Sequence, residues 1–108
     1  MTVEHLAKTP GFSAAALPCP EREINGAYSG DLLSWVMSKA DSDNAWITIM
    51  SNVNVIAVAT LTDVSCVILA EGVSPNEELV SLSCSKNVNL LTTELSAYEC
   101  AITLGKMI

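Results

Sequence analysis

The heptapeptide VSCVILA, residues 64–70, is the segment that decides the fold. Its nearly continuous apolar run is typical of a β-strand that is covered on both faces of a sheet. The apolar run at 45–50 predicts a second buried strand, and residues 88–92 predict a third. Strands of this kind occur in parallel sheets, whose connections lay helices against both faces. These three segments therefore predict a parallel sheet at the centre of the molecule.

Helical patterns occupy the segments between these strands. From Gly30 to Ala40 the apolar residues recur at helical spacing, which predicts a helix before the strand at 45–50. Two S-x-x-E sequences mark further helix starts: Ser74–Glu77 is read as a capping box with proline at the first helical position, and Ser96–Glu99 as a second box. Strands that alternate with helices imply right-handed crossovers and a mostly parallel sheet of about four to five strands in a single α/β domain.

Two other segments are less sharply defined by their patterns. Residues 53–62 are rich in β-branched side chains, which favours a strand, yet several of these side chains also share one helical face, which favours a helix. Residues 1–8 predict one or two helical turns, and residues 12–17 predict a short strand. Because Pro18 and Pro20 remove two backbone donors, this strand belongs at an edge of the sheet or outside it.

The size and charge of the chain limit its partners. The chain has 108 residues, enough for one domain, and twelve acidic residues against five basic ones give a net charge of −7. The basic residues are scattered singly, whereas phosphate backbones are bound through clustered Lys and Arg, so we expect no nucleic acid and no membrane among the partners. No apolar run approaches the ~18 residues of a membrane span, and residues 1–8 lack the apolar core of a signal peptide. We therefore expect a cytoplasmic protein.

The chain lacks the residue patterns of the common catalytic and metal sites. None of the four cysteines is part of a C-x-x-C pair, and His5 is the single histidine, so we expect neither a metal site nor a cofactor. A P-loop requires G-x-x-x-x-G-K-[ST], but the only Gly-Lys pair is Gly105-Lys106. A Ser-His-Asp or Cys-His site requires a positioned histidine, which this chain does not offer. These patterns predict a protein that is not an enzyme.

Several separated motifs, in order along the chain, resemble those of the DRTGG domain family. The matching segments are Arg22–Leu33, Trp46–Ile49, Asn54–Ala59, Glu71–Pro75 and Leu91–Glu99. The resemblance runs from Glu21 to the C-terminus, so residues 1–108 are read as a single DRTGG-like domain with a variable N-terminal segment at 1–20. In the motif that gives the family its name, Asn25 replaces the threonine and Ala27 replaces the second glycine. If the second glycine serves the close approach of a ligand, Ala27 weakens that function.

The resemblance implies an α/β domain similar to the N-terminal domain of HPr kinase/phosphorylase. Such domains accompany phosphotransacetylases and regulated pyrophosphatases, and they also occur alone. In each setting catalysis belongs to the neighbouring domains, which implies a regulatory, non-catalytic role here. The resemblance also implies that residues 53–62 form a helix.

The candidate ligand site lies at the carboxyl ends of the predicted strands. In open α/β sheets, ligands bind beyond these ends, at a switch point in strand order. The candidate ligand-binding residues are Gly26, Tyr28, Ser29, Asp31, Ser51, Asn52, Glu71, Gly72, Thr93 and Glu94. The carboxylates among them repel a polyphosphate, so an uncharged or cationic group such as a nucleoside fits better.

The glycine-containing stretch at 26–31 is read as a turn followed by a helix cap. Ser29 is expected to cap the helix, with Asp31 in its first turn, where a negative charge suits the helix dipole. If Gly26 has a positive φ, its replacement by valine should destabilise the fold.

Two functions remain open at this point. The first is a stand-alone regulatory module that binds a nucleotide-like ligand. The second is a protein-interaction or dimerisation module without a small ligand, which the two tryptophans, Trp35 and Trp46, favour as core or interface residues. Glu71 and Glu94 are either paired catalytic carboxylates or, as exposure of carboxylates favours, solvated acids at strand ends. The expected partners are a second copy of the chain or a partner enzyme.

Overall fold

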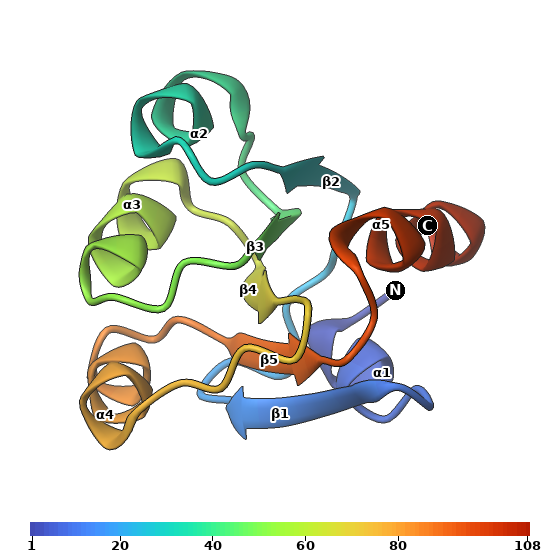
Figure 1. The fold of residues 1–108 in the computed structure, drawn as a ribbon, viewed down its shortest axis with the longest axis horizontal. Helices are drawn as coiled ribbons and strands as arrows, with labels where there is room; N and C mark the ends of the chain where they lie inside the picture. Colours follow the sequence, from blue (N-terminus) through green and yellow to red (C-terminus); the bar gives the residue numbers. More distant parts are fainter.

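A five-stranded sheet forms the middle layer of the computed structural model, which describes residues 1–108 (Figure 1). In chain order the strands are β1 (Phe12–Ala16), β2 (Gly26–Ser29), β3 (Asn44–Thr48), β4 (Cys66–Leu69) and β5 (Leu90–Thr93). Across the sheet their order is β1-β5-β4-β3-β2. Strands β2 to β5 are parallel, and β1 lies antiparallel to β5 at one edge. The sheet is therefore mixed, and the strand before the two prolines has the predicted edge position.

Helices cover both faces of the sheet (Figure 1). The helices are α1 (Val3–Ala7), α2 (Leu33–Lys39), α3 (Asn54–Thr62), α4 (Glu77–Ser85) and α5 (Ala97–Met107). Buried side chains of α2, α3 and α4 pack in one core on one face, and those of α1 and α5 pack in a second core on the other. The longest helix has 11 residues, and none combines the length and hydropathy of a membrane span.

The central strand β4 supplies both cores, as its apolar run predicted. All four of its residues are buried, and because successive side chains of a strand point to opposite faces, they alternate between the two cores. Trp46 of β3 is fully buried against α2 and α3, and its indole Nε1 donates to the carbonyl of Gly30 at 2.9 Å. Trp35 of α2 is instead 56% exposed, with the ammonium of Lys39 lying 4.9 Å from its ring centre.

The helix starts test the capping predictions one by one. The helix over residues 53–62 is confirmed by α3. The capping box at Ser96 is confirmed: its hydroxyl accepts from the amide of Glu99 at 3.1 Å, and the Glu99 carboxylate accepts from the Ser96 amide. The box at Ser74 is wrong, because Asn76 occupies the N-cap position and accepts from the Leu79 amide at 2.9 Å. Asn is at least as good a cap as Ser, so the helix begins two residues later.

The first four residues of the stretch at 26–31 form a strand and not a turn. Residues Gly26–Ser29 form β2, and Gly26 pairs with Asn44 at the start of β3. Its φ is not among the positive values, so the argument for valine as a disruptive replacement fails on conformation. The remaining constraint is steric, because an added Cβ would lie 3.2 Å from Asn44 Nδ2.

The predicted cap of α2 is also wrong. Leu32 occupies the N-cap position and makes no side-chain capping bond, so Ser29 lies outside the helix. Asp31 also precedes the helix, and its carboxylate accepts from Thr48 Oγ1 at 2.7 Å and from the Ile49 amide at 3.0 Å. The partner of this charge is therefore the end of the neighbouring strand β3, and not the dipole of α2. This strand end lies close to Asp31 only in the folded chain.

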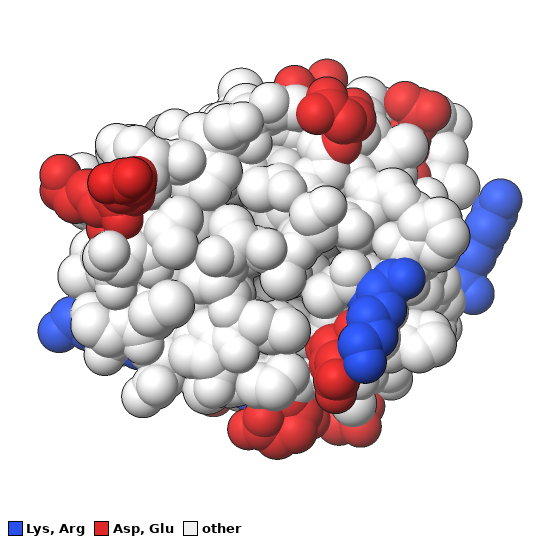
Figure 2. Space-filling model, turned by 90° about the horizontal axis from the view of Figure 1, so that it is seen from below, with Lys and Arg blue, Asp and Glu red and all other residues white.

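Charged side chains are dispersed on the face that contains the edge strand β1, with α4 and α1 at its flanks. Figure 2 shows acidic groups and a few basic side chains separated by uncharged surface on this face. Along α1, Lys8 forms an ion pair with Glu4 at 3.0 Å. The face therefore presents no cluster of basic side chains.

Candidate functional site

The connections that leave the parallel strands place one crevice at the carboxyl end of the sheet. The loops after β2, β3 and β4 lead to helices on one face, whereas the loop after β5 leads to α5 on the other. Adjacent loops that part toward opposite faces leave space between them, and ligands of open α/β sheets bind there. The four parallel strands follow one another in chain order, so the expected reversal of strand order is absent. Instead, the connections switch from one face of the sheet to the other between β4 and β5.

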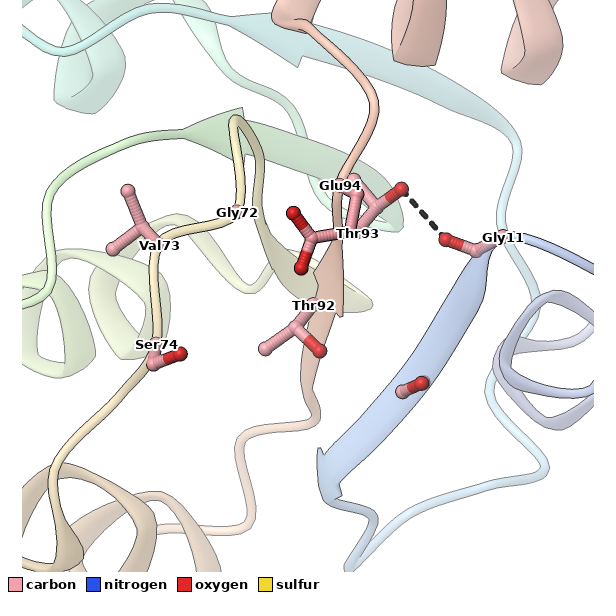
Figure 3. A pocket seen from close by; sticks show the side chains of 8 residues that line it. Gly11, Gly72, Val73, Ser74, Thr92, Thr93 and Glu94 are labelled. Carbon is pink, nitrogen blue, oxygen red and sulfur yellow. Dashed lines mark hydrogen bonds between the residues drawn. The ribbon is translucent and has the colours of Figure 1, made fainter.

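A pocket of about 100 Å³ lies at this position (Figure 3). It is lined by Gly11, Ser13, Gly72, Val73, Ser74, Thr92, Thr93 and Glu94. These residues come from the start of β1, from the loop after β4 and from the end of β5. Three segments that are distant in sequence therefore form one small, polar site.

Four side chains of the pocket offer oxygens that no protein group engages. The hydroxyls of Ser13, Ser74 and Thr92 and the carboxylate of Glu94 make no hydrogen bond within the chain, and no buried side-chain oxygen or nitrogen lacks a partner. These oxygens therefore face solvent. Figure 3 shows the side chains of Ser74, Thr92 and Glu94 around the space between β5 and the loop after β4. The pocket can accept and donate hydrogen bonds through the hydroxyls and accept them through the carboxylate.

Gly72 makes room for the carboxylate of Glu94. A Cβ added at Gly72 would lie 2.5 Å from Glu94 Oε2, which is closer than atoms in real structures approach. The φ of Gly72 is +73°, a conformation that side chains disfavour. Glycine at this position therefore serves two purposes, because it allows both the turn after β4 and the close approach of the carboxylate.

Backbone bonds hold the two sides of the crevice together. The amide of Glu71 donates to the carbonyl of Leu95 at 2.8 Å, and the amide of Gly72 donates to the carbonyl of Thr93 at 3.0 Å. Glu71 Oε2 accepts from the Ala97 amide at 3.0 Å, at the first residue of α5. Glu71 therefore caps a helix, while Glu94 stays unpartnered. The two carboxylates therefore have different surroundings.

Thr93 fixes the start of β1 beside the pocket. Its hydroxyl donates to the carbonyl of Gly11 at 2.7 Å and accepts from the Leu95 amide at 3.2 Å. The dashed line in Figure 3 marks the first of these bonds. Since both functions of this hydroxyl are used by the protein, Thr93 shapes the pocket without offering a side-chain group to a ligand.

Three of the ten residues named from the sequence line the pocket: Gly72, Thr93 and Glu94. Asp31, Ser51, Asn52 and Glu71 lie after strand ends at the same edge of the sheet but outside the pocket. Asn52 is engaged locally, because its Oδ1 accepts from the Asn54 amide at 2.9 Å.

The β2 residues of that set lie away from the pocket. Gly26 is at the amino end of β2, the opposite end of the sheet. The ring of Tyr28 is half-buried beside Gly30, and Ser29 is exposed on the edge strand. The other lining residues, Gly11, Ser13, Val73, Ser74 and Thr92, were not predicted. Two of these five, Val73 and Thr92, each lie beside two predicted residues in the sequence, and no other signal indicated them.

Two buried cysteines lie outside the site and are poor nucleophiles. Burial raises the pKa of the Cys66 thiol to about 12 and that of the Cys100 thiol to about 11. Because the thiolate is the reactive form, both side chains remain neutral, core-packed thiols at neutral pH.

No protein-family model and no curated protein sequence matches the chain. A solved structure is similar in fold: the CBS and DRTGG domains of the regulatory region of Clostridium perfringens pyrophosphatase, complexed with the activator diadenosine tetraphosphate. The TM-score is 0.72 at 14% sequence identity, and the alignment covers 94% of this chain and 44% of that chain. The chain therefore has a DRTGG-like fold, as its motifs predicted, and spans less than half the length of that regulatory region.

Proposed function

We propose that the chain is a non-catalytic regulatory module that binds the sugar of a nucleoside-like ligand in the pocket between β4 and β5. One observation carries this proposal: the unpartnered oxygens of Ser13, Ser74, Thr92 and Glu94 converge at the point where adjacent connections part. Polar groups that a protein holds together without pairing them remain available to a ligand.

A ribose diol fits the chemistry of these groups. A carboxylate accepts hydrogen bonds only, so Glu94 calls for a donor, and each ribose hydroxyl is one. In dinucleotide-binding folds an acidic residue beyond a strand holds the ribose in this manner. The pocket volume of about 100 Å³ is well below the ~300–1,000 Å³ of pockets that enclose a drug-sized ligand. The pocket therefore takes one fragment of the ligand, and the base and any phosphate remain outside.

The charge around the pocket disfavours a phosphate. None of the lining residues is basic, Glu94 is acidic, and the chain carries a net charge of −7. Like charges a few ångströms apart repel, and screening by salt weakens this repulsion for exposed groups. We expect adenosine to bind more tightly than ATP, with the difference shrinking as the salt concentration rises.

The solved structure of similar fold supports a regulatory role. The pyrophosphatase region with this fold is regulatory and binds the activator diadenosine tetraphosphate. That region also contains CBS domains, so the activator belongs in a ligand panel as one member. Together with the missing P-loop and the single histidine, the comparison favours a module that regulates rather than catalyses. The cytoplasmic location stays a prediction.

Amide chemical shifts during titration with adenosine test the ligand site. We expect shifts centred on Gly72, Thr92 and Glu94, and none with 2′,3′-dideoxyadenosine, which lacks the diol. Glu94→Gln should weaken binding roughly tenfold, because it removes a charged hydrogen-bond acceptor. Asp41→Asn makes the same chemical change at an exposed site between α2 and β3, and should leave binding unchanged. Equal shifts with both nucleosides, or no shift at millimolar adenosine, would overturn the proposal.

A second candidate function is self-association or docking to a partner enzyme. The observation in its favour is the outer face of α3, where Leu61 is 73% exposed and no side chain is charged. This function does not depend on the ligand pocket.

A further inference from the structure

Helix α3 has an uncharged outer side that exposes apolar side chains. No residue from Ser51 to Thr62 is charged. The inner side of α3 is buried in the core, whereas its outer side exposes Ala57 and Leu61 beside the polar, uncharged Asn54 and Thr60, with Val53 at its start. A surface helix normally carries charged residues toward solvent, so an outer side that has no charge and exposes a large apolar side chain is unusual. The outer side of α3 therefore has the character of an interface.

An open groove of about 560 Å³ runs between α3 and α4 beside this surface. It is lined by Val53, Asn54, Ile56, Ala57, Thr60, Leu61, Leu82 and Lys86. A second depression continues from it, because both include Val53 and Leu82, and this depression reaches Glu78 at the start of α4. The groove thus extends along α4 from Glu78 to Lys86.

Charge and shape differ between the two ends of the groove. Helices α3 and α4 both follow parallel strands and run in the same direction, so their starts lie together and their ends lie together. The starting end carries Glu78 and a hollow beside Val53. The finishing end carries Lys86 and the protruding Leu61. One end therefore complements the other.

We propose that the α3–α4 groove is the interface of a homodimer, in which a second copy docks groove to groove with its helices antiparallel. This inference rests on the second candidate function and is independent of the ligand pocket. A two-fold axis perpendicular to the helices produces this arrangement, and each contact then occurs twice. Leu61 of each copy enters the hollow beside Val53 of the other, and Lys86 faces Glu78. A two-fold axis parallel to the helices would instead bring like charges to the same level, which is unfavourable.

Sedimentation equilibrium over a range of concentrations tests the interface. Leu61→Asp should weaken the dimer roughly tenfold or more, because it places a charge in an apolar contact. Tyr98→Asp is the matched control, since Tyr98 is a large, 75% exposed side chain on α5, on the other face of the sheet. The control should leave the dimer unchanged, and thermal melts should show that both variants fold.

A charge exchange tests the antiparallel orientation. Lys86→Glu and Glu78→Lys should each weaken the dimer, because each places like charges opposite one another. The double variant, Glu78→Lys with Lys86→Glu, should restore it. A dimer that is insensitive to Leu61→Asp would overturn the groove as the interface and leave self-association intact, whereas a wild-type monomer at high concentration would overturn both. A dimer that the double variant fails to restore would overturn the antiparallel orientation. None of these outcomes affects the adenosine titration.

Discussion

At the amino end of the parallel strands, Arg22 donates to Asp43 at 2.7 Å and to Asp63 at 3.1 Å, whereas at the carboxyl end Glu94 has no partner in the chain. The guanidinium of Arg22 also donates to the carbonyls of Asp63 and Val64. Both ends of the sheet carry acidic residues, but only one end supplies a base to neutralise them. The number of acidic residues at each end therefore does not indicate where a ligand binds. The difference that indicates it is whether these acidic residues have partners within the chain.

A second set of bonds closes the amino end. Asn89 is buried, and its side chain accepts from the Cys19 amide at 2.9 Å and donates to the carbonyls of Cys19 at 2.7 Å and Ser65 at 2.9 Å. These bonds fix the segment that crosses the sheet from β1 at one edge to β2 at the other. At the amino end of the sheet, polar groups therefore bond to other groups of the chain, whereas the pocket at the carboxyl end keeps unpaired polar side chains.

The largest effect is expected from Asn89→Ala. The substitution leaves the amide and carbonyl of the half-buried Cys19 and the carbonyl of the buried Ser65 without their Asn89 partner, so we expect a loss of about 2–4 kcal/mol in the free energy of unfolding. Urea unfolding measures this loss. Asn52→Ala at the carboxyl end is the control, because it removes one exposed bond and should cost about 0.5–1 kcal/mol. Equal losses for the two variants would mean that the amino end is no better fixed than the carboxyl end.

The second-largest loss of stability is expected from Gly72→Ala. The positive φ of Gly72 should cost about 1–2 kcal/mol of stability, and the new Cβ should displace Glu94 and abolish the response to adenosine. Gly11→Ala is the comparison within the same pocket, because Gly11 also lines it and has a positive φ, but no neighbouring atom lies within 4 Å of the added Cβ. We expect Gly11→Ala to lose stability and to leave the Glu94 carboxylate in place, which its side-chain chemical shifts in the ligand-free protein would report. Displacement of the Glu94 carboxylate in both variants would contradict a specific role for the space at Gly72.

A smaller effect concerns acid stability at the amino end. The hydrogen bond from Ser42 at 2.6 Å, together with the charge of Arg22, lowers the pKa of Asp63. A folded-state pKa below the unfolded value contributes stability above the unfolded pKa, and this stability is lost as the pH falls through the folded pKa. The melting temperature of the wild type should therefore decline below about pH 4. Asp63→Asn should decline less steeply and Ser42→Ala should lie between them, and identical pH profiles would exclude Asp63 as a contributor.

The smallest effect is expected from Glu94→Gln. Because this carboxylate makes no hydrogen bond in the chain, its loss should change the free energy of unfolding by less than about 0.5 kcal/mol. Asp43→Asn, which weakens the pair with Arg22, should cost more in the same urea experiment. A loss above about 1 kcal/mol for Glu94→Gln would show that Glu94 has a structural partner, and the contrast between the two ends of the sheet would fail.

The elements whose formation depends on nearby residues were predictable from the sequence. The apolar run at 64–70 predicted the buried β4, and the Ser96–Glu99 box predicted the start of α5, because burial pattern and capping act within a few residues along the chain. Local rules failed where two caps competed, at Ser74 and Asn76, since either side chain can bond the first amides of α4. The helix over residues 53–62 required the family resemblance, because its periodicity alone fitted a strand as well.

The site depends on contacts between distant segments of the folded chain. Folding brings Thr93 into hydrogen-bond contact with Gly11, 82 positions away in the sequence. It also pairs the Asp31 carboxylate with Thr48 of the neighbouring strand, so this carboxylate is not available to a ligand. It also sent α5 to the opposite face from α4, which created the pocket around Glu94. The physical reason is that sheet order and the pairing of polar groups depend on packing between distant segments. A sequence motif shows which residues are polar, but only the folded chain shows which of them remain unpaired.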